Sequence, residues 1–241
     1  MYQNIYFEVK KQKIHLWDDK KGYLVIPYKK YAYIKNQTGL HYTLDGDKVK
    51  KIYDWDKDTR GLYEADVPQT TRFLVDQYTD SDEVSEGHRK LFFDIEVEVT
   101  DGFPDPSKAE NKITAIALYD KVADKYHCYV LGDVPNTDVV ESFKSEKELL
   151  QRFYQKYLEI QPTILSGWNT DGFDIPYLYN RTQRTMGTQI ANCLSPIGEV
   201  YWNEQRSMYK IAGVSCLDYL KLYKWFTYTQ QSSYRLDYIG Q

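Results

Sequence analysis

Apolar and polar residues alternate along several short stretches of the N-terminal part of the chain. The clearest are NIYFEV, KIHLW, GYLVIPY and YAYIK, which are separated by Lys, Asp and Gly residues. A period of two is typical of half-buried β-strands, and the residues between these stretches favour turns. Residues 1 to about 65 are therefore predicted to form a small β-rich module.

A helix and a polar linker are predicted next. In VPQTTRFLVDQY, Pro68 falls in the first helical turn, where its missing N–H is tolerated. The stretch DSDEVSEGHRK that follows is polar and resembles a linker. The prediction is thus a β-rich domain with linker over residues 1–88 and a second domain over residues 89–241.

The second domain changes from strand patterns to alternating helix and strand patterns. Strands are predicted at about 90–98, 113–120 and 125–132. Ser145 and Glu148 then form a capping box ahead of apolar residues at helical spacing, PTILSGWN is a short buried strand, and another helix begins around Asp174. This order predicts an α/β fold.

One strand of this domain, within LFFDIEVEVT, has an apolar face and an acidic face, because successive side chains point to opposite sides. The acidic face carries Asp94, Glu96 and Glu98, and the other carries Leu91, Phe93, Ile95 and Val97. The simple interpretation is that this acidic face is exposed to solvent. The alternative is that its carboxylates form a catalytic site.

A second acidic cluster lies in GWNTDGFDIPYLYNR, where a strand leads into a helix at Asp174. Helix N-termini favour carboxylates, so Asp174 or Asp171 as a helix cap is the structural interpretation. An aromatic residue in a loop, Phe103 between Gly102 and Pro104, has a structural interpretation as well: it packs the loop onto the domain.

Composition limits the class of protein but says little about the reaction it performs. The net charge is −4, so nucleic-acid contacts would have to be local, and the 24 tyrosines suit either base stacking or half-buried sheets. Three cysteines without metal-like spacing fit a reducing compartment, and there is no long apolar run. We expect a cytoplasmic protein without membrane contact.

Read together, four segments resemble family B DNA polymerases, the first and third of them especially those of T-even-type bacteriophages. They are LFFDIEVEVTDGFPDPSKAE, LSGWNTDGFDIPYLYNR, GVSCLDYLKLYKWFTYTQQSSYRLDYIG and LYEADVPQTTRFLVD, covering most of residues 62–241. Asp94-Ile95-Glu96, followed by Asn169 and Phe173-Asp174, resembles the first two exonuclease motifs of that family. The resemblance implies a ribonuclease-H-like exonuclease domain, a mixed sheet with flanking helices, that removes mispaired nucleotides from the 3′ end of a primer.

The resemblance also implies roles for individual residues. Asp94, Glu96 and Asp174 would bind two divalent ions, Mg²⁺ or Mn²⁺, and Glu96 would also orient the attacking water. Phe103, Asn169 and Phe173 would contact DNA. Trp168 is expected in the core, Arg181 on a phosphate or in a salt bridge, and residues 201–209 at a hairpin that separates primer from template.

The chain departs from the family pattern after Tyr234, because Tyr234 and Asp237 have the wrong spacing for the third exonuclease motif. The exonuclease domain is therefore expected to be incomplete at its C-terminus, with the remaining polymerase domains in cis or on a separate chain. Its partners would be single-stranded 3′ ends and primer-template DNA. The alternatives are a catalytically incomplete nucleic-acid-binding fragment and a stand-alone exonuclease.

Overall fold

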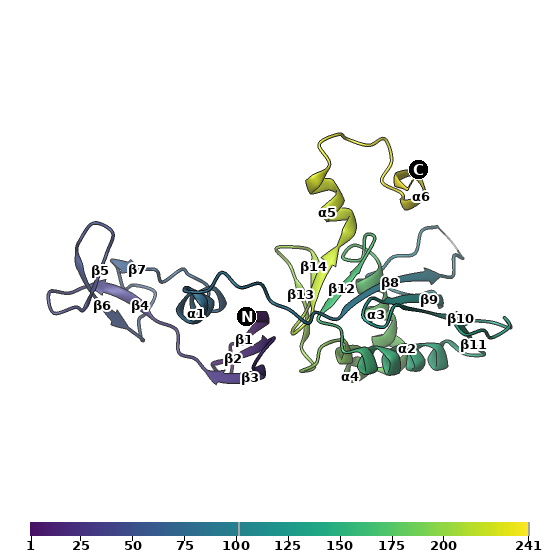
Figure 1. The fold of residues 1–241 in the computed structure, drawn as a ribbon, viewed down its shortest axis with the longest axis horizontal. Helices are drawn as coiled ribbons and strands as arrows, with labels where there is room; N and C mark the ends of the chain where they lie inside the picture. Colours follow the sequence, from purple (N-terminus) through teal and green to yellow (C-terminus); the bar gives the residue numbers. More distant parts are fainter. Residues whose placement is uncertain (101, 241) are drawn as a thin grey trace. The chain divides into compact units, whose positions relative to one another are not determined.

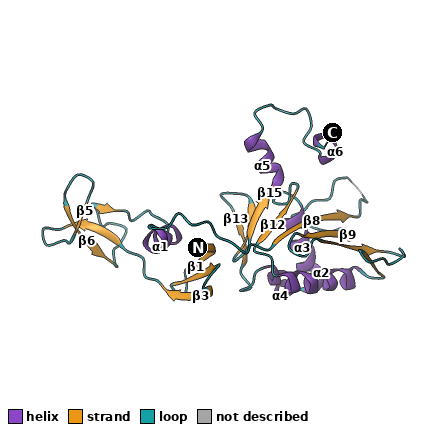
Figure 2. Ribbon diagram, viewed as in Figure 1, coloured by secondary structure: helices purple, strands orange, loops and turns teal. Residues whose placement is uncertain are grey.

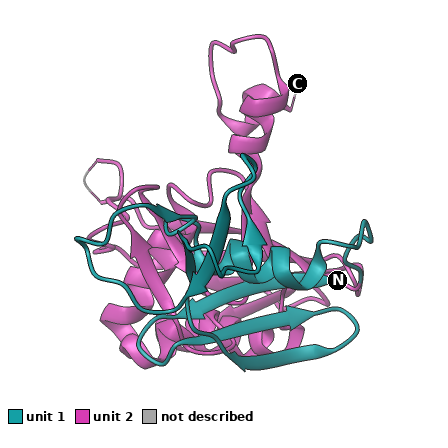
Figure 3. Cartoon of the chain, turned by 90° about the vertical axis from the view of Figure 1, so that its left-hand side faces the viewer, with its two compact units in different colours: residues 1–86 teal, residues 87–241 magenta. Residues whose placement is uncertain are grey.

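The computed structural model describes residues 1–100 and 102–240, and the chain divides into two compact units (Figures 1 and 3). The first unit comprises Met1–Glu86 and the second begins at Gly87. No helix of the described residues is long and apolar enough to cross a membrane.

Two small antiparallel sheets and one helix make up the first unit. The three-stranded sheet has the order β1-β2-β3, and the four-stranded sheet has the order β5-β6-β4-β7. The elements are β1 (Tyr2–Glu8), β2 (Lys13–Asp18), β3 (Gly22–Pro27), β4 (Ala32–Lys35), β5 (His41–Tyr42), β6 (Lys48–Ile52), β7 (Leu62–Tyr63) and α1 (Gln69–Tyr78). Ile14 and Leu16 of β2 form a small core with Phe73 of α1. The alternation in KIHLW therefore buries one face of β2 against a helix.

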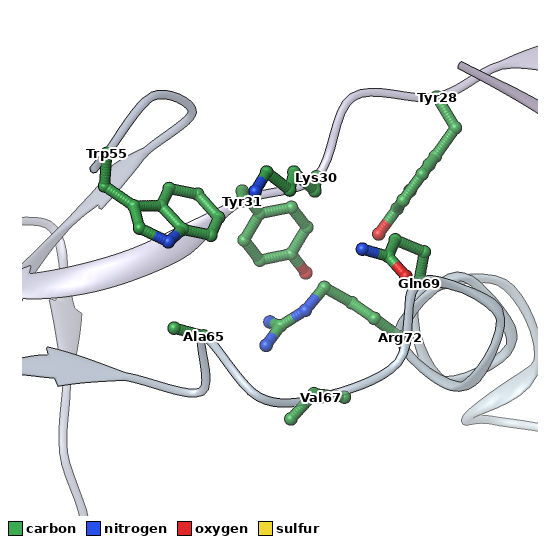
Figure 4. Close-up of a pocket in the computed structure, with 8 residues that line it drawn as sticks. All are labelled: Tyr28, Lys30, Tyr31, Trp55, Ala65, Val67, Gln69 and Arg72. Atoms are coloured by element: carbon green, nitrogen blue, oxygen red, sulfur yellow. The ribbon is translucent and has the colours of Figure 1, made fainter. Parts of the chain in front are cut away.

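A narrow polar pocket lies between the second sheet and α1 in this unit (Figure 4). The guanidinium of Arg72, on α1, lies 4.2 Å from the centre of the Tyr31 ring and also pairs with Glu64 at 2.8 Å. The Lys30 ammonium lies 4.4 Å from the centre of the Trp55 ring. The contact between Arg72 and Tyr31 connects the helix to the segment that enters β4.

The second unit is a mixed α/β structure built on one six-stranded sheet (Figure 2). Its order is β11-β10-β9-β8-β12-β15; β8 is antiparallel to β9 and parallel to β12, and β12 is parallel to β15. The strands are β8 (Lys90–Val97), β9 (Ile113–Asp120), β10 (Lys125–Leu131), β11 (Val140–Phe143), β12 (Ile164–Gly167), and β15 (Ser215–Asp218). A separate hairpin pairs β13 (Val200–Asn203) with β14 (Met208–Ile211).

Two longer helices of this unit pack on the sheet through buried residues, whereas the last two helices have no buried residues and extend away from the sheet (Figure 1). The helices are, in chain order, α2 (Glu146–Ile160), α3 (Asp174–Met186), α4 (Thr188–Ala191), the short 3₁₀ helix Asn192–Leu194, α5 (Tyr219–Phe226) and α6 (Leu236–Ile239). The predicted capping box of α2 is confirmed, since the Ser145 side chain accepts from the Glu148 N–H and the Glu148 side chain accepts from the Ser145 N–H. Leu149, Leu150 and Phe153 of α2 enter the core with the apolar face of β8.

Several strands were not predicted from the sequence. Strand β6 (KVKKI) is mostly lysine, and β11 (VESF) is short, so neither has a clear apolar period. Each is held by pairing with a neighbour: β6 with β4 and β5, and β11 with β10. Cross-strand hydrogen bonds thus outweigh local propensity here.

Candidate active site

Strand β8 has the predicted two-faced character. Leu91, Phe93 and Ile95 are buried, at 0%, 3% and 5% exposure. Asp94 and Glu96 lie on the opposite, exposed face, on a strand in the middle of the sheet. The two carboxylates are therefore held on a rigid strand and not on a loop.

Asp174 joins this strand from the start of α3. Its side chain is buried at 3% exposure, and its Oδ1 accepts a hydrogen bond from the backbone N–H of Ile95 at 3.1 Å. The helix-cap interpretation is wrong, because the N-cap position of α3 is Phe173 and no side-chain cap bond forms there. The carboxylate of Asp174 instead binds the residue between Asp94 and Glu96.

The path of the chain around Gly167 makes this approach possible. Strand β12 pairs with β8 only from Lys90 to Phe92. A side chain at Gly167 would collide with the Phe93 carbonyl oxygen, and Asn169 adopts a left-handed φ of 62°. The chain therefore stops pairing with β8 after β12. The Ile95 N–H, which lies past the last residue paired with β12, donates to Asp174 instead.

Burial and like charge work against ionisation of these groups. Burial, and then the charge of Asp94, raise the pKa of Asp174 to about 7. The pKa of Asp94 is raised by partial loss of hydration and then by Glu96, although the residue is open to solvent. A cation would relieve this repulsion, and hard carboxylate oxygens suit Mg²⁺ or Mn²⁺.

The three predicted ligands are neighbours in pairs, Asp94 with Glu96 and Asp94 with Asp174. Over residues 1–100 and 102–240, no group of three or more His, Cys, Asp and Glu side chains forms a ready metal site. The donor set fits divalent ions by its chemistry and its mutual repulsion.

Phe103 lies near these carboxylates through its contact with α3. Its side chain is 83% exposed, and its ring lies 5.3 Å from that of Phe173, which in turn contacts Tyr177 at 5.4 Å. Phe173 packs against the core, whereas Asn169 is exposed. An open pocket of about 270 Å³ lies beside Phe103 and is bordered by Thr100, Pro104, Asp105, Lys108, Glu110, Asn111 and Tyr177.

Two residues have roles that differ from part of the expectation. Arg181 forms a bidentate pair with Glu146, at 2.8 and 2.6 Å, so its salt-bridge interpretation is confirmed. Trp168 is only half-buried, and its indole N–H donates to the Tyr234 carbonyl at 3.0 Å. The expectation of Trp168 in the core is wrong, because its ring packs against Tyr219 and Tyr223 of the exposed helix α5 and lies outside the buried cluster.

Asp218 is the acidic residue near this region that sequence reasoning missed. It ends β15, and since β8, β12 and β15 are parallel, their carboxyl ends meet at one edge of the sheet. Its carboxylate accepts hydrogen bonds from the N–H groups of Asn169 and Asp171. The pattern SCLDYLK, a strand ending in Asp before a helix, was the available signal.

The fold defines a mixed α/β domain with two carboxylates on a central strand of its sheet, and comparison with known proteins gives the family. The family model for the exonuclease domain of DNA polymerase family B matches residues 77–239. The chain therefore belongs to DNA polymerase family B, through its exonuclease domain.

Two phage proteins, both named DNA-directed DNA polymerase, are among the relatives. The one from Escherichia phage RB69 is 34% identical over 206 residues, which is 70% of this chain and 23% of that protein. The one from Enterobacteria phage T4 is 33% identical over 181 residues, or 61% of this chain and 20% of that protein. DNA polymerase 1 of Sulfurisphaera ohwakuensis is 31% identical over 145 residues, or 57% of this chain and 14% of that protein. The chain thus spans about a quarter or less of these relatives.

Proposed function

We propose that residues 89–241 form a ribonuclease-H-like 3′-to-5′ exonuclease domain that removes mispaired nucleotides from single-stranded DNA ends. The observation that carries the proposal is the hydrogen bond from the Ile95 N–H to Asp174, which brings the carboxylate of α3 to the acidic strand. The family match and the mixed sheet with flanking helices support it.

The chain's own residues have distinct roles in this proposal. Asp94, Glu96 and Asp174 would supply carboxylate oxygens to the ions. Glu96, on the same face as Asp94, would also accept a hydrogen bond from the attacking water and orient it. Two divalent ions, when bound, activate that water and stabilise the leaving 3′ oxygen. Burial works against ionisation of Asp174, so a bound cation would stabilise its charged form.

Phe103 is proposed to stack on a base of the frayed strand. Stacking contributes about 1–3 kcal/mol per base and accepts every base, as proofreading requires. The exposure of its ring leaves a face free for this contact. Phe173 would support Phe103 through their ring contact at 5.3 Å, and Asn169 would bind the same nucleotide by hydrogen bonding.

The polymerase that this domain serves belongs to the proposal as well. The relatives are DNA-directed DNA polymerases several times longer than this chain. We propose that the remaining domains, in cis or on a second chain, bind primer-template DNA and provide the third exonuclease motif. The hairpin of β13 and β14 stays a candidate for separating primer from template.

One observation favours a second candidate, a nucleic-acid-binding fragment that is catalytically incomplete. Within the described residues, no ready site for a metal ion is formed by three side chains. The fragment would then bind single strands without cutting them until the rest of the polymerase is added.

Incubation of a 5′-labelled single-stranded oligonucleotide with the protein and Mg²⁺ or Mn²⁺ tests the proposal. We expect shortening from the 3′ end that EDTA abolishes. Asp174→Asn should lower the rate more than about 100-fold, because loss of a residue that only supports a metal ligand already costs about 10–100-fold, and Asp174 is proposed as a ligand itself. Phe103→Ala should raise KM about 5- to 100-fold, the equivalent of one stacked base.

Asp237→Asn is the matched control, since Asp237 is exposed and its carboxylate contacts its sequence neighbours, Arg235 at 3.7 Å and the Tyr238 N–H at 3.0 Å. It should leave the rate unchanged. Binding of the oligonucleotide without shortening would favour the second candidate, and shortening that survives Asp174→Asn would refute the assigned site.

A further inference from the structure

The carboxylate of Asp218 is a buried acceptor for three backbone N–H groups. Its exposure is 4%, and its Oδ1 accepts from Asn169 at 3.1 Å and from Leu220 at 2.9 Å, while its Oδ2 accepts from Asp171 at 3.2 Å. The Leu220 bond caps α5, whereas the other two bonds hold the turn that precedes Asp174.

We infer that Asp218 is a positioning residue for the exonuclease reaction, which fixes the Asn169–Asp171 turn and through it the carboxylate of Asp174 against β8. This inference rests on the proposed function. It concerns a residue outside the set of Asp94, Glu96 and Asp174.

The turn needs such support because its backbone is strained. Asn169 is in the left-handed region at φ 62°, a conformation that costs about 1–3 kcal/mol unless the surroundings enforce it. Hydrogen bonds from backbone N–H groups to a carboxylate are about twice as strong as neutral ones. Asp218 therefore supplies the enforcing contacts from a strand that is rigidly paired with β12.

A short series of bonds connects the turn to Asp174. The N–H groups of Gly172 and Phe173 both donate to the Asn169 carbonyl at 3.0 Å. The N–H of Ile175 donates to the Thr170 carbonyl at 2.9 Å. A shift of Asn169 or Thr170 would therefore move the first turn of α3, where Asp174 lies.

A second contact from α5 reaches the same turn. Lys221, one helical turn after Asp218, donates to the Asp171 carboxylate at 2.7 Å. Both carboxylate oxygens of Asp218 accept hydrogen bonds from backbone N–H groups. We therefore assign Asp218 to the support of the backbone and not to the binding of an ion. The start of α5 thus holds the turn at two points.

Two substitutions separate this role from simple capping of α5. Asp218→Ser should keep the cap of α5, because Ser and Asp cap helices about equally well. The Ser side chain is too short to accept the two hydrogen bonds from the turn. Asp218→Asn keeps one oxygen and places an NH₂ group opposite the Asp171 N–H. Ser145→Ala, which removes the cap of α2 far from the turn, is the matched control for lost capping.

The test compares the whole wild-type chain with these variants in three measurements. They are amide hydrogen exchange at Asn169 and Asp171, Mn²⁺ affinity by calorimetry, and exonuclease kinetics. We expect both Asp218 variants to exchange at these amides more than about tenfold faster and to lose about 10–100-fold in Mn²⁺ affinity and kcat, with KM for the oligonucleotide unchanged. Ser145→Ala should lower the unfolding temperature without these changes.

Wild-type rates, exchange and Mn²⁺ affinity in Asp218→Ser would overturn the inference. So would a loss shared equally by Ser145→Ala, since it would reflect stability alone. An inactive wild-type chain would refute the proposed function for this fragment, while exchange and Mn²⁺ affinity would still decide the role of Asp218.

Discussion

Asp174 combines two properties that a soluble protein rarely places together, burial and an acidic neighbour. Its carboxylate accepts a backbone hydrogen bond from Ile95, yet its pKa is raised to about 7 by burial and by Asp94. A structural carboxylate would be expected to have compensating positive charge. The arrangement is costly for folding and useful for binding cations.

Asp174→Asn should therefore stabilise the metal-free protein at alkaline pH. Between about pH 4 and pH 7 the folded state keeps a proton that the unfolded state releases, so this contribution to stability is complete below pH 4 and is lost as pH rises through 7. In EDTA at pH 8 the variant should be more stable by roughly 1–4 kcal/mol.

Urea unfolding at pH 5 and pH 8 measures this difference, which should shrink at pH 5. Added Mn²⁺ should stabilise the wild type and not the variant. A variant that is less stable than wild type at pH 8 would contradict the assigned environment of Asp174.

At the scale of elements, the buried pair of Arg181 and Glu146 joins four segments. Glu146, in the first turn of α2, also accepts from the Ile113 N–H at the start of β9 at 2.8 Å. Arg181, on α3, also donates to the Glu110 carbonyl at 2.6 Å. This pair fixes α3 relative to the segment that follows Phe103.

Arg181→Met should cost about 3–5 kcal/mol of unfolding free energy, because Glu146 would stay buried without its partner. Arg235→Met makes the same replacement in an exposed pair, with side chains 82% and 71% exposed, and should cost less than about 1 kcal/mol. Denaturant unfolding of both variants gives the comparison. Equal costs would show that the buried pair contributes no more than a surface pair.

At the scale of the whole molecule, the two units have different cores and should respond differently to acid. In the first unit, burial alone would raise the pKa of Asp18, but bonds from the Lys21 and Lys20 N–H groups and from the Tyr78 hydroxyl outweigh it and lower the pKa to about 2. Asp18 connects the end of β2 to α1.

Acid should therefore destabilise the first unit through Asp18. The depressed pKa contributes stability above about pH 4 that is lost as pH falls toward 2, with a magnitude of about 1–2 kcal/mol. Asp18→Asn should lower the free energy of unfolding of the first unit by that amount at pH 7. It should also make the stability of residues 1–86 less dependent on pH in the acidic range. Hydrogen exchange with mass spectrometry resolves the two units, and an equal effect on both would refute the assignment.

The sequence alone determined the features that are local or periodic. The two faces of β8, the capping box at Ser145 and the start of α3 near Asp174 follow from periods of two and 3.6 and from cap chemistry within a few residues. The acidic candidates were visible for the same reason, because their spacing along one strand is a local property.

Only the tertiary structure decided which backbone groups those side chains satisfy. The carboxylate of Asp174 accepts a hydrogen bond from the Ile95 N–H on β8. The carboxylate of Asp218 accepts one from the Asn169 N–H, in the turn between β12 and α3. Strand β6, rich in lysine, exists because β4 and β5 pair with it. A buried N–H must find an acceptor wherever the fold brings one, and that partner can lie anywhere along the chain.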